Sequence, residues 1–204
     1  MKLPITDLRS VGIPSPRVES EQKVGGKAIY AGDVVLPGML WVKVLRSPFA
    51  HARIKKIDAL RALAAPGVKT ILTGDDFGGT KIGKKIIDMP ILADGVVRYV
   101  GEKVVAVAAE SETEAEAAIE LIDVEYEQLP LVLDPLQAIE PSAPLLHSGV
   151  TEYKGLLHKI ESPSNVFVHL TWKKGEVEEG FRQSDITVEN TYSVPAVHQA
   201  GEKP

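Results

Sequence analysis

A strand–helix–strand unit between residues 103 and 127 constrains the fold more than any other part of the sequence. Residues 103–109 form a short, continuous apolar run, which predicts a strand buried on both faces. A helix over 113–122 follows, with Thr113 and Glu116 placed as a capping box. Residues 123–127 alternate apolar and polar, which predicts a second strand. The helix has one apolar stripe, and the strand has two inward side chains: Ala115, Ala118, Ile119 and Ile122, then Val124 and Tyr126.

Elements of both kinds precede this unit. Strands are expected at 39–47, 52–58 and 68–73, and a short helix at 59–65 is ended by Pro66-Gly67. The links between them have hairpin length. The order of elements therefore favours an α+β fold over a doubly wound α/β sheet.

Proline and glycine mark the remaining segments. The proline-rich start of the chain predicts an extended arm, because proline is excluded from helix interiors and sheet ladders. Residues 134–164 hold four prolines and little periodicity, which indicates a surface linker. After it we expect a strand at 165–173, a short helix at 176–183 and a strand at 185–194.

Composition narrows the class of partner. The 204 residues are 44% hydrophobic and 25% charged, which is typical of a globular domain with a proper core. A net charge of −5 argues against nucleic acid as a partner, since phosphate binding needs a basic surface. The absence of cysteine excludes disulfides and a cysteine nucleophile in this chain. Without an apolar run of signal-peptide or membrane-spanning length, the cytoplasm is the expected location and no membrane partner is predicted.

One glycine-rich segment, residues 78–85, approaches the phosphate-binding P-loop. That motif needs a hydroxyl after its lysine and a helix behind it, whereas here Lys85 takes the hydroxyl position and Pro90 follows closely. We interpret it as a surface turn with solvated lysines.

Other reactive residue types are scattered rather than grouped. Asp75-Asp76 fits a turn and helix cap, and Glu112, Glu116 and Glu120 share a solvated face. Ser47 precedes His51 by four positions, but no orienting acid accompanies them. The histidines do not stand at metal-ligand spacing: His51, His147, His158, His169 and His198. We therefore predict no catalytic, cofactor-binding or metal-binding residue within this chain.

Short segments in a fixed order resemble one protein family. They include Lys-Val-Gly-Gly-Lys-Ala-Ile-Tyr-Ala-Gly-Asp at 23–33, Leu-Arg-Ser-Pro-Phe-Ala-His-Ala-Arg-Ile at 45–54 and Val-Arg-Tyr-Val-Gly-Glu-Lys-Val at 97–104. Further segments are 17–19, 36–40, 66–68, 72–76, 123–130, 145–147, 174–181 and 188–192. Together they resemble the opening of the molybdenum-binding large subunit of the xanthine dehydrogenase and aldehyde oxidase family.

The resemblance implies a division of the chain. It implies an extended arm over 1–22, an α/β-hammerhead domain over 23–134, a proline-rich linker over 135–164 and the truncated start of a molybdopterin-binding domain over 165–204. Within the hammerhead domain, Gly101 is expected at a positive φ and Pro37-Gly38 in a tight turn. The family pattern stops after His198, so a split gene, an interrupted reading frame and a cut chain are open alternatives.

The resemblance also implies a function for the whole enzyme. That enzyme would be an oxidoreductase that hydroxylates or dehydrogenates a small carbonyl or heteroaromatic substrate with molybdopterin and iron–sulfur clusters. This chain is expected to bind neither cofactor alone and to be a non-catalytic segment. Its partners would be the remainder of the molybdenum subunit, an iron–sulfur subunit and, as an open alternative, a flavin subunit. A stand-alone interaction module and a non-functional remnant are the rival hypotheses.

Overall fold

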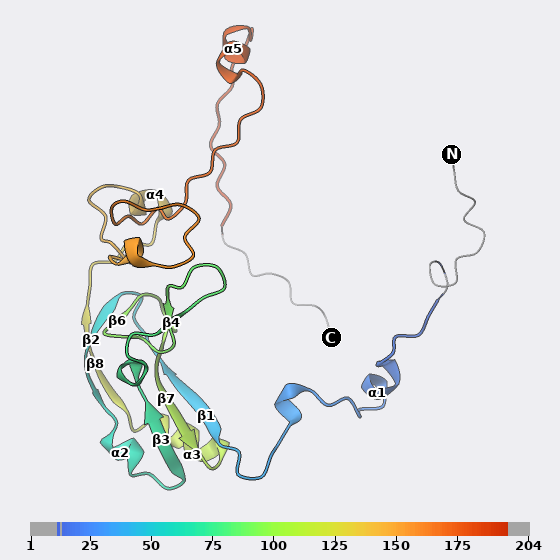
Figure 1. The fold of residues 1–204 in the computed structure, drawn as a ribbon, viewed down its shortest axis with the longest axis vertical. Coiled ribbons are helices and arrows are strands. Elements are labelled where there is room, and N and C mark those ends of the chain that lie inside the picture. Colours follow the sequence, from blue (N-terminus) through green and yellow to red (C-terminus); the bar gives the residue numbers. More distant parts are fainter. Residues whose placement is uncertain (1–11, 13, 196–204) are drawn as a thin grey trace.

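The structure, a computed structural model, describes residues 12 and 14–195 and confirms the α+β class (Figure 1). All strand pairs are antiparallel, in sheets of order β1-β7-β3, β6-β2-β8 and β4-β5. The strands are β1 Trp41–Arg46, β2 Ala52–Asp58, β3 Val68–Leu72, β4 Lys81–Ile82, β5 Met89–Pro90, β6 Val96–Val97, β7 Lys103–Ala109 and β8 Asp123–Gln128. The helices are α1 Ser20–Val24, η1 Ala31–Asp33, α2 Leu60–Leu63, η2 Gly74–Phe77, α3 Glu112–Ile119, α4 Pro135–Ala138, η3 Val150–Glu152 and α5 Val177–Arg182.

Strand β7 is the centre of the core, as its apolar run predicts. It lies between β1 and β3, and its residues Val104, Val105 and Val107 are fully buried. Neighbouring residues of a strand point to opposite faces, so the burial of both Val104 and Val105 means that both faces are covered. Helix α3 packs on β1 and β7, and Ala52 of β2 joins the same core.

The second sheet accommodates an irregular pattern in β2. Ile54 and Ile57 stand three positions apart, which would place them on opposite faces of a regular strand. The pairing of β2 with β8 shifts register between Ile54 and Lys56, and both isoleucines pack against the core. An irregularity of this kind turns the following side chain to the other face. On β8, Val124 and Tyr126 pack against the same core, in agreement with the predicted alternation.

The predicted cap of the long helix is wrong by two residues. Helix α3 begins at Glu112, and Ser111 is its N-cap: the Ser111 hydroxyl accepts from the Glu114 amide at 3.3 Å and donates to the Glu114 carboxylate at 2.8 Å. Thr113 lies inside the first turn and is exposed. Ser111 takes the cap because its backbone is extended, which is the conformation that an N-cap residue requires.

Two turns form as predicted. Gly101 has a φ of 88° at the turn before β7, and Gly38 has a φ of 76°. The Met39 amide donates to the Leu36 carbonyl at 3.1 Å, which closes the turn at Pro37-Gly38.

Part of the segment predicted as a linker is folded. Residues 135–164 contain α4 and η3, and Val150 is buried, so this segment packs onto the body instead of only lying on its surface. In the predicted arm, α1 begins at Ser20, while residues 1–11 and 13 lie outside the described part of the chain.

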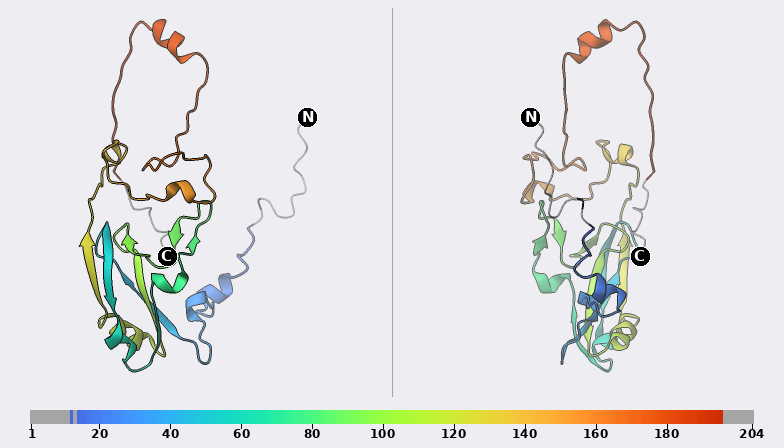
Figure 2. Two further views of the ribbon diagram at one scale, coloured as in Figure 1. Left: turned by 60° about the vertical axis from the view of Figure 1, so that its left-hand side comes forward. Right: turned by 90° about the vertical axis from the view of Figure 1, so that its right-hand side faces the viewer.

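The strands predicted at 165–173 and 185–194 are not formed. Residues 165–195 make a long excursion with α5 at its tip, and the two limbs have no ladder hydrogen bonds within the described residues (Figure 2). Their side chains are largely exposed, so neither limb has the covered face that stabilises a sheet. The predicted helix at 176–183 is present as α5. Within the described residues, no helix has the length and apolar character needed to cross a bilayer.

Candidate functional site

A cavity of about 550 Å³ lies between the sheets and the segment that follows them. We call it the linker cavity. Its walls come from the turn at 50–51, from residues between 86 and 100, and from the segment 130–167. In Figure 1 this segment, with α4 and η3, sits over the end of the sheets near β4 and β6. The cavity is thus built where the proline-rich segment folds back on the strands.

The first wall depends on His51. Its Nδ1 donates to the Pro130 carbonyl at 2.7 Å, and the Leu129 amide donates to the His51 carbonyl at 3.0 Å. These bonds hold the exit from β8 against the entry to β2. The chain therefore enters the cavity wall at Pro130 in a fixed direction.

The second wall depends on close backbone packing at Gly155. The Ile87 amide donates to the Lys154 carbonyl at 2.9 Å, which joins the segment to the β4–β5 hairpin. Gly155 has a φ of 82°, and a Cβ added to it would lie 1.7 Å from the Lys85 carbonyl oxygen. Only glycine permits this approach.

The third wall depends on Asn165, whose side-chain NH₂ donates to two backbone carbonyls. The acceptors are Ala138 and Pro144, each at 3.0 Å. One amide group thereby joins α4 to the loop that precedes His147.

His147 and Tyr153 form the polar part of the cavity lining. Nδ1 of His147 lies 2.9 Å from the Tyr153 hydroxyl, and the two rings meet edge to face at 5.7 Å. Nζ of Lys81 lies 4.4 Å from the centre of the Tyr153 ring. Burial lowers the pKa of His147, and the charge of Arg98 lowers it further. The imidazole is therefore neutral at pH 7.

Arg98 brings a positive charge to the same cavity. Its Nη1 donates to the Val96 carbonyl at 3.1 Å, and its backbone N–H donates to the Glu102 carboxylate. The Nε atom of Arg98 is buried and has no hydrogen-bond partner. Burial raises the pKa of Glu102, an effect that the bond from Arg98 partly offsets.

The residues singled out from sequence are distributed unevenly. His51 and His147 both line the cavity, although the sequence pattern assigns neither to a site. Ser47 is buried, and its hydroxyl bonds the backbone of Phe49. Glu112 and Glu116 both form ion pairs with Lys43. Asp76 caps η2 from inside a turn. His158 and His169 do not line the cavity, and His198 lies outside the described residues. Residues 78–85 fold as a turn and strand of the β4–β5 hairpin, with exposed lysines.

Sequence reasoning missed Arg98, Asp88 and Tyr153. Each lines the cavity, but each comes from a different segment, so no spacing in the sequence links them. Only Arg98 carries a local signal, since it follows the apolar pair Val96-Val97 and precedes the Gly101 turn.

The described residues present no cluster of side-chain ligands for a metal ion. The chain has no cysteine, and among residues 12 and 14–195 there is no group of three or more His, Cys, Asp or Glu side chains that could hold a metal ion. The cavity instead has apolar walls with a few inward polar groups. That arrangement is suited to binding.

Three comparisons place the chain among known proteins. It is 40% identical over 180 residues to a probable xanthine dehydrogenase subunit of Bacillus subtilis, covering 88% of this chain and 22% of the relative. It is 34% identical to the nicotinate dehydrogenase large molybdopterin subunit of Eubacterium barkeri, covering 92% of this chain and 41% of that one. The solved CO dehydrogenase of Oligotropha carboxidovorans matches with a TM-score of 0.66 and 40% identity, over 69% of this chain and 18% of the other.

The chain therefore spans between about a fifth and two fifths of these two curated relatives. A family model described as "Aldehyde oxidase and xanthine dehydrogenase, a/b hammerhead domain" matches residues 25–130, more than half of the chain. This range contains both three-stranded sheets and α3. By sequence and by fold, the chain belongs to the aldehyde oxidase and xanthine dehydrogenase family and carries its hammerhead domain.

Proposed function

We propose that this chain is a non-catalytic segment of a molybdenum-containing hydroxylase or dehydrogenase. In this proposal it contributes the hammerhead domain over 23–134, preceded by the arm over 1–22 and followed by the linker over 135–164. Residues 165–204 are the start of the molybdopterin-binding domain. The family membership supports the proposal, as does the limited share of each relative that the chain covers.

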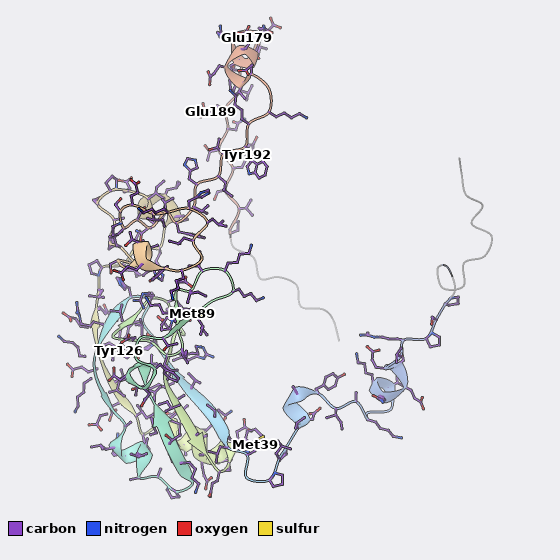
Figure 3. All side chains as sticks on the ribbon, viewed as in Figure 1. Met39, Met89, Tyr126, Glu179, Glu189 and Tyr192 are labelled. Atoms are coloured by element: carbon purple, nitrogen blue, oxygen red, sulfur yellow. The ribbon has the colours of Figure 1, made fainter. Side chains whose placement is uncertain are left out.

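The exposed excursion after Asn165 carries this proposal. Apolar side chains alternate along 166–172 and, interrupted by Asn190, along 186–194, a pattern typical of strands. Figure 3 shows Tyr192 and Glu189 on this excursion, far from Tyr126 in the second sheet. Trp172, Ile186 and Tyr192 are 92%, 80% and 86% exposed. Strands of this kind are stabilised when another polypeptide supplies ladder partners and covers the apolar face. The remainder of the molybdenum subunit would do both.

The cofactors belong to the whole enzyme in this proposal. Molybdopterin is named in the Eubacterium barkeri relative, which supports its presence in the complete enzyme. Iron–sulfur clusters would be held by a separate subunit, since no cysteine is available in this chain. Assemblies with and without a flavin subunit are alternatives within this proposal. The complete enzyme would act on a small carbonyl or heteroaromatic substrate.

The test is co-expression with the remainder of the molybdenum subunit from the same genome. The two polypeptides should co-purify, and elemental analysis should find molybdenum in the complex but not in the chain purified alone. Stoichiometric molybdenum in the chain alone would contradict the non-catalytic assignment. A failure to co-purify would contradict the structural one.

A stand-alone interaction module is the second candidate. The observation that favours it is the self-contained core of the sheets and α3, which is closed without residues 165–195. The neighbouring coding sequence discriminates the two. A reading frame that resumes the family pattern supports the enzyme segment, and a genome without one supports the module.

A further inference from the structure

The rim of the linker cavity is apolar and uncovered. Leu131, Leu133 and Val100 line it and are 53%, 78% and 64% exposed. They come from two segments of the chain, one before β7 and one after β8. Exposed apolar patches of this kind mark interaction sites in soluble proteins.

Arg98 and Asp88 bring opposite charges to the cavity lining, but Arg98 has no ion-pair partner among the described residues. Several cations of the domain have carboxylate partners, as in the pairs Lys69–Glu110 and Arg61–Asp123. The buried Nε of Arg98 has a proton to donate and no acceptor in reach. A buried donor without an acceptor is costly, so an incoming acceptor would be stabilising here.

The charged groups near His147 favour an anionic ligand over a cationic one. Three charged groups act on the pKa of the His147 ring: Arg98 and Lys81 disfavour its positive form, and Asp88 favours it. The effect of Arg98 is larger than that of Asp88, and Lys81, which does not line the cavity, adds to it. Arg98 also acts more strongly than Asp88 on the pKa of Tyr153. Together with the unpartnered Nε–H of Arg98, these effects favour a carboxylate over a cation as the group that enters.

The position of the cavity favours a polypeptide as the occupant. Asn165 and Phe167 line the cavity, and the chain leads from them directly into the exposed strand-patterned limbs. A partner that pairs with the first limb would therefore lie next to the cavity. Such a partner would also cover Phe167, which is 48% exposed.

We propose that the linker cavity receives an apolar segment of the remainder of the molybdenum subunit, and that an Asp or Glu on this segment pairs with Arg98. The inference rests on the proposed function, because the partner is the one named there. It adds the place of contact, the chemistry of the inserted segment and the residue that selects it.

The experiment measures the affinity of the 204-residue chain for the separately produced remainder at several salt concentrations. Arg98→Met should weaken binding about ten- to hundredfold, since truncating one member of a buried charge pair strands the other. It should also flatten the salt dependence, which a purely structural role would not do. Arg98→Lys keeps the charge and should retain part of the affinity. Lys84→Met is the matched control, because Lys84 is exposed on the adjacent hairpin and does not line the cavity.

A photo-crosslinking amino acid at Val100 provides a readout that does not need Arg98 to be altered. The crosslinked peptide should contain an acidic residue among apolar ones. A peptide without an acidic residue, or an Arg98→Met chain that binds with unchanged affinity and salt dependence, would overturn the inference and leave the proposed function standing. Absence of any complex with the unaltered chain would overturn both.

Discussion

The side-chain oxygen of Asn165 accepts a hydrogen bond from the backbone N–H of Leu146 at 3.1 Å. The Asn165 NH₂ group donates both of its hydrogens, one to the Ala138 carbonyl and one to the Pro144 carbonyl. The side chain therefore bonds three backbone groups within the segment 138–146. Replacing the side-chain nitrogen by an oxygen, or the oxygen by a nitrogen, would remove hydrogen bonds. Asn165 therefore determines how the segment 138–146 lies over the linker cavity.

Replacing Asn165 by aspartate should open this loop. The carboxylate can still accept from Leu146, but it has no hydrogen to donate and places negative charge against two carbonyl oxygens. We expect the local free energy of opening to fall by about 1–3 kcal/mol, the cost of leaving buried polar groups unpaired. Hydrogen exchange at the Leu146 amide should accelerate accordingly. Asn190→Asp, at an exposed position, is the control and should leave that amide unchanged.

Removing the helix cap tests which hydroxyl starts α3. Ser111→Ala should lower the free energy of unfolding by about 1 kcal/mol, because the Glu114 amide loses its acceptor. Thr113→Ala should have almost no effect, since Thr113 is exposed within the first turn. Urea denaturation of both variants measures the difference. Equal urea midpoints for the two variants would contradict the assignment of Ser111, and not Thr113, as the N-cap.

Core truncation should be graded by burial. The apolar stripe predicts that Ile119 faces the buried strand, but Ile119 is only half-buried, whereas Ile122 is 8% exposed and belongs to the core cluster. Ile122→Ala should therefore cost about 2–5 kcal/mol through lost burial and the cavity left behind. Ile119→Ala should cost clearly less. Urea unfolding of the two variants decides, and a larger loss at Ile119 would show that the helix faces are wrongly placed.

The sequence predicted features that local patterns mark and missed contacts between residues far apart in the chain. The unit at 103–127 could be predicted because an apolar run and a helical stripe mark it locally, and its strand β7 begins and ends where the apolar run does. The linker cavity is specified by distant contacts instead. His51 and Pro130 meet only because β2 and β8 pair, and Tyr153 reaches the cavity only because Gly155 packs on Lys85. No local period encodes either contact.

The strands predicted at 165–173 and 185–194 are a different kind of error. The sequence does alternate there, and its apolar side chains are exposed, among them Leu170, Trp172, Ile186 and Val188. Alternation selects which side chains would share a face, but a strand forms only when backbone groups find ladder partners. The helix between them needs no such partner, because its bonds are internal, and it is present as α5.

Acid should weaken the packing of the linker segment. Burial lowers the pKa of His147 in the folded chain, so the unfolded chain binds a proton there first as the pH falls below about 6.5. The stability that the neutral ring contributes is complete above that pH and is lost as the pH falls towards the lower, folded-state pKa. His147→Gln should remove part of the pH dependence of unfolding between about pH 7 and 5. His169→Gln, at an exposed position, should not, and equal pH profiles for all three chains would refute the assignment.

The excursion after Asn165 should be the least protected part of the described chain. Its limbs have no ladder bonds, and its apolar side chains are exposed, so little free energy opposes their opening. Strand β7 and helix α3 share the buried core and should exchange most slowly. We expect hydrogen exchange after residue 165 to be fast and exchange within 103–126 to be slow. Brief proteolysis should cut within or beyond 134–164 and leave an N-terminal core.

The partner complex is the informative comparison: if the limbs become strands there, amides in 166–172 and 186–194 should gain protection in alternation, because only every second amide of an edge strand joins a given ladder. Equal protection of both regions in the isolated chain would show instead that residues 165–195 pack on the sheets without any partner.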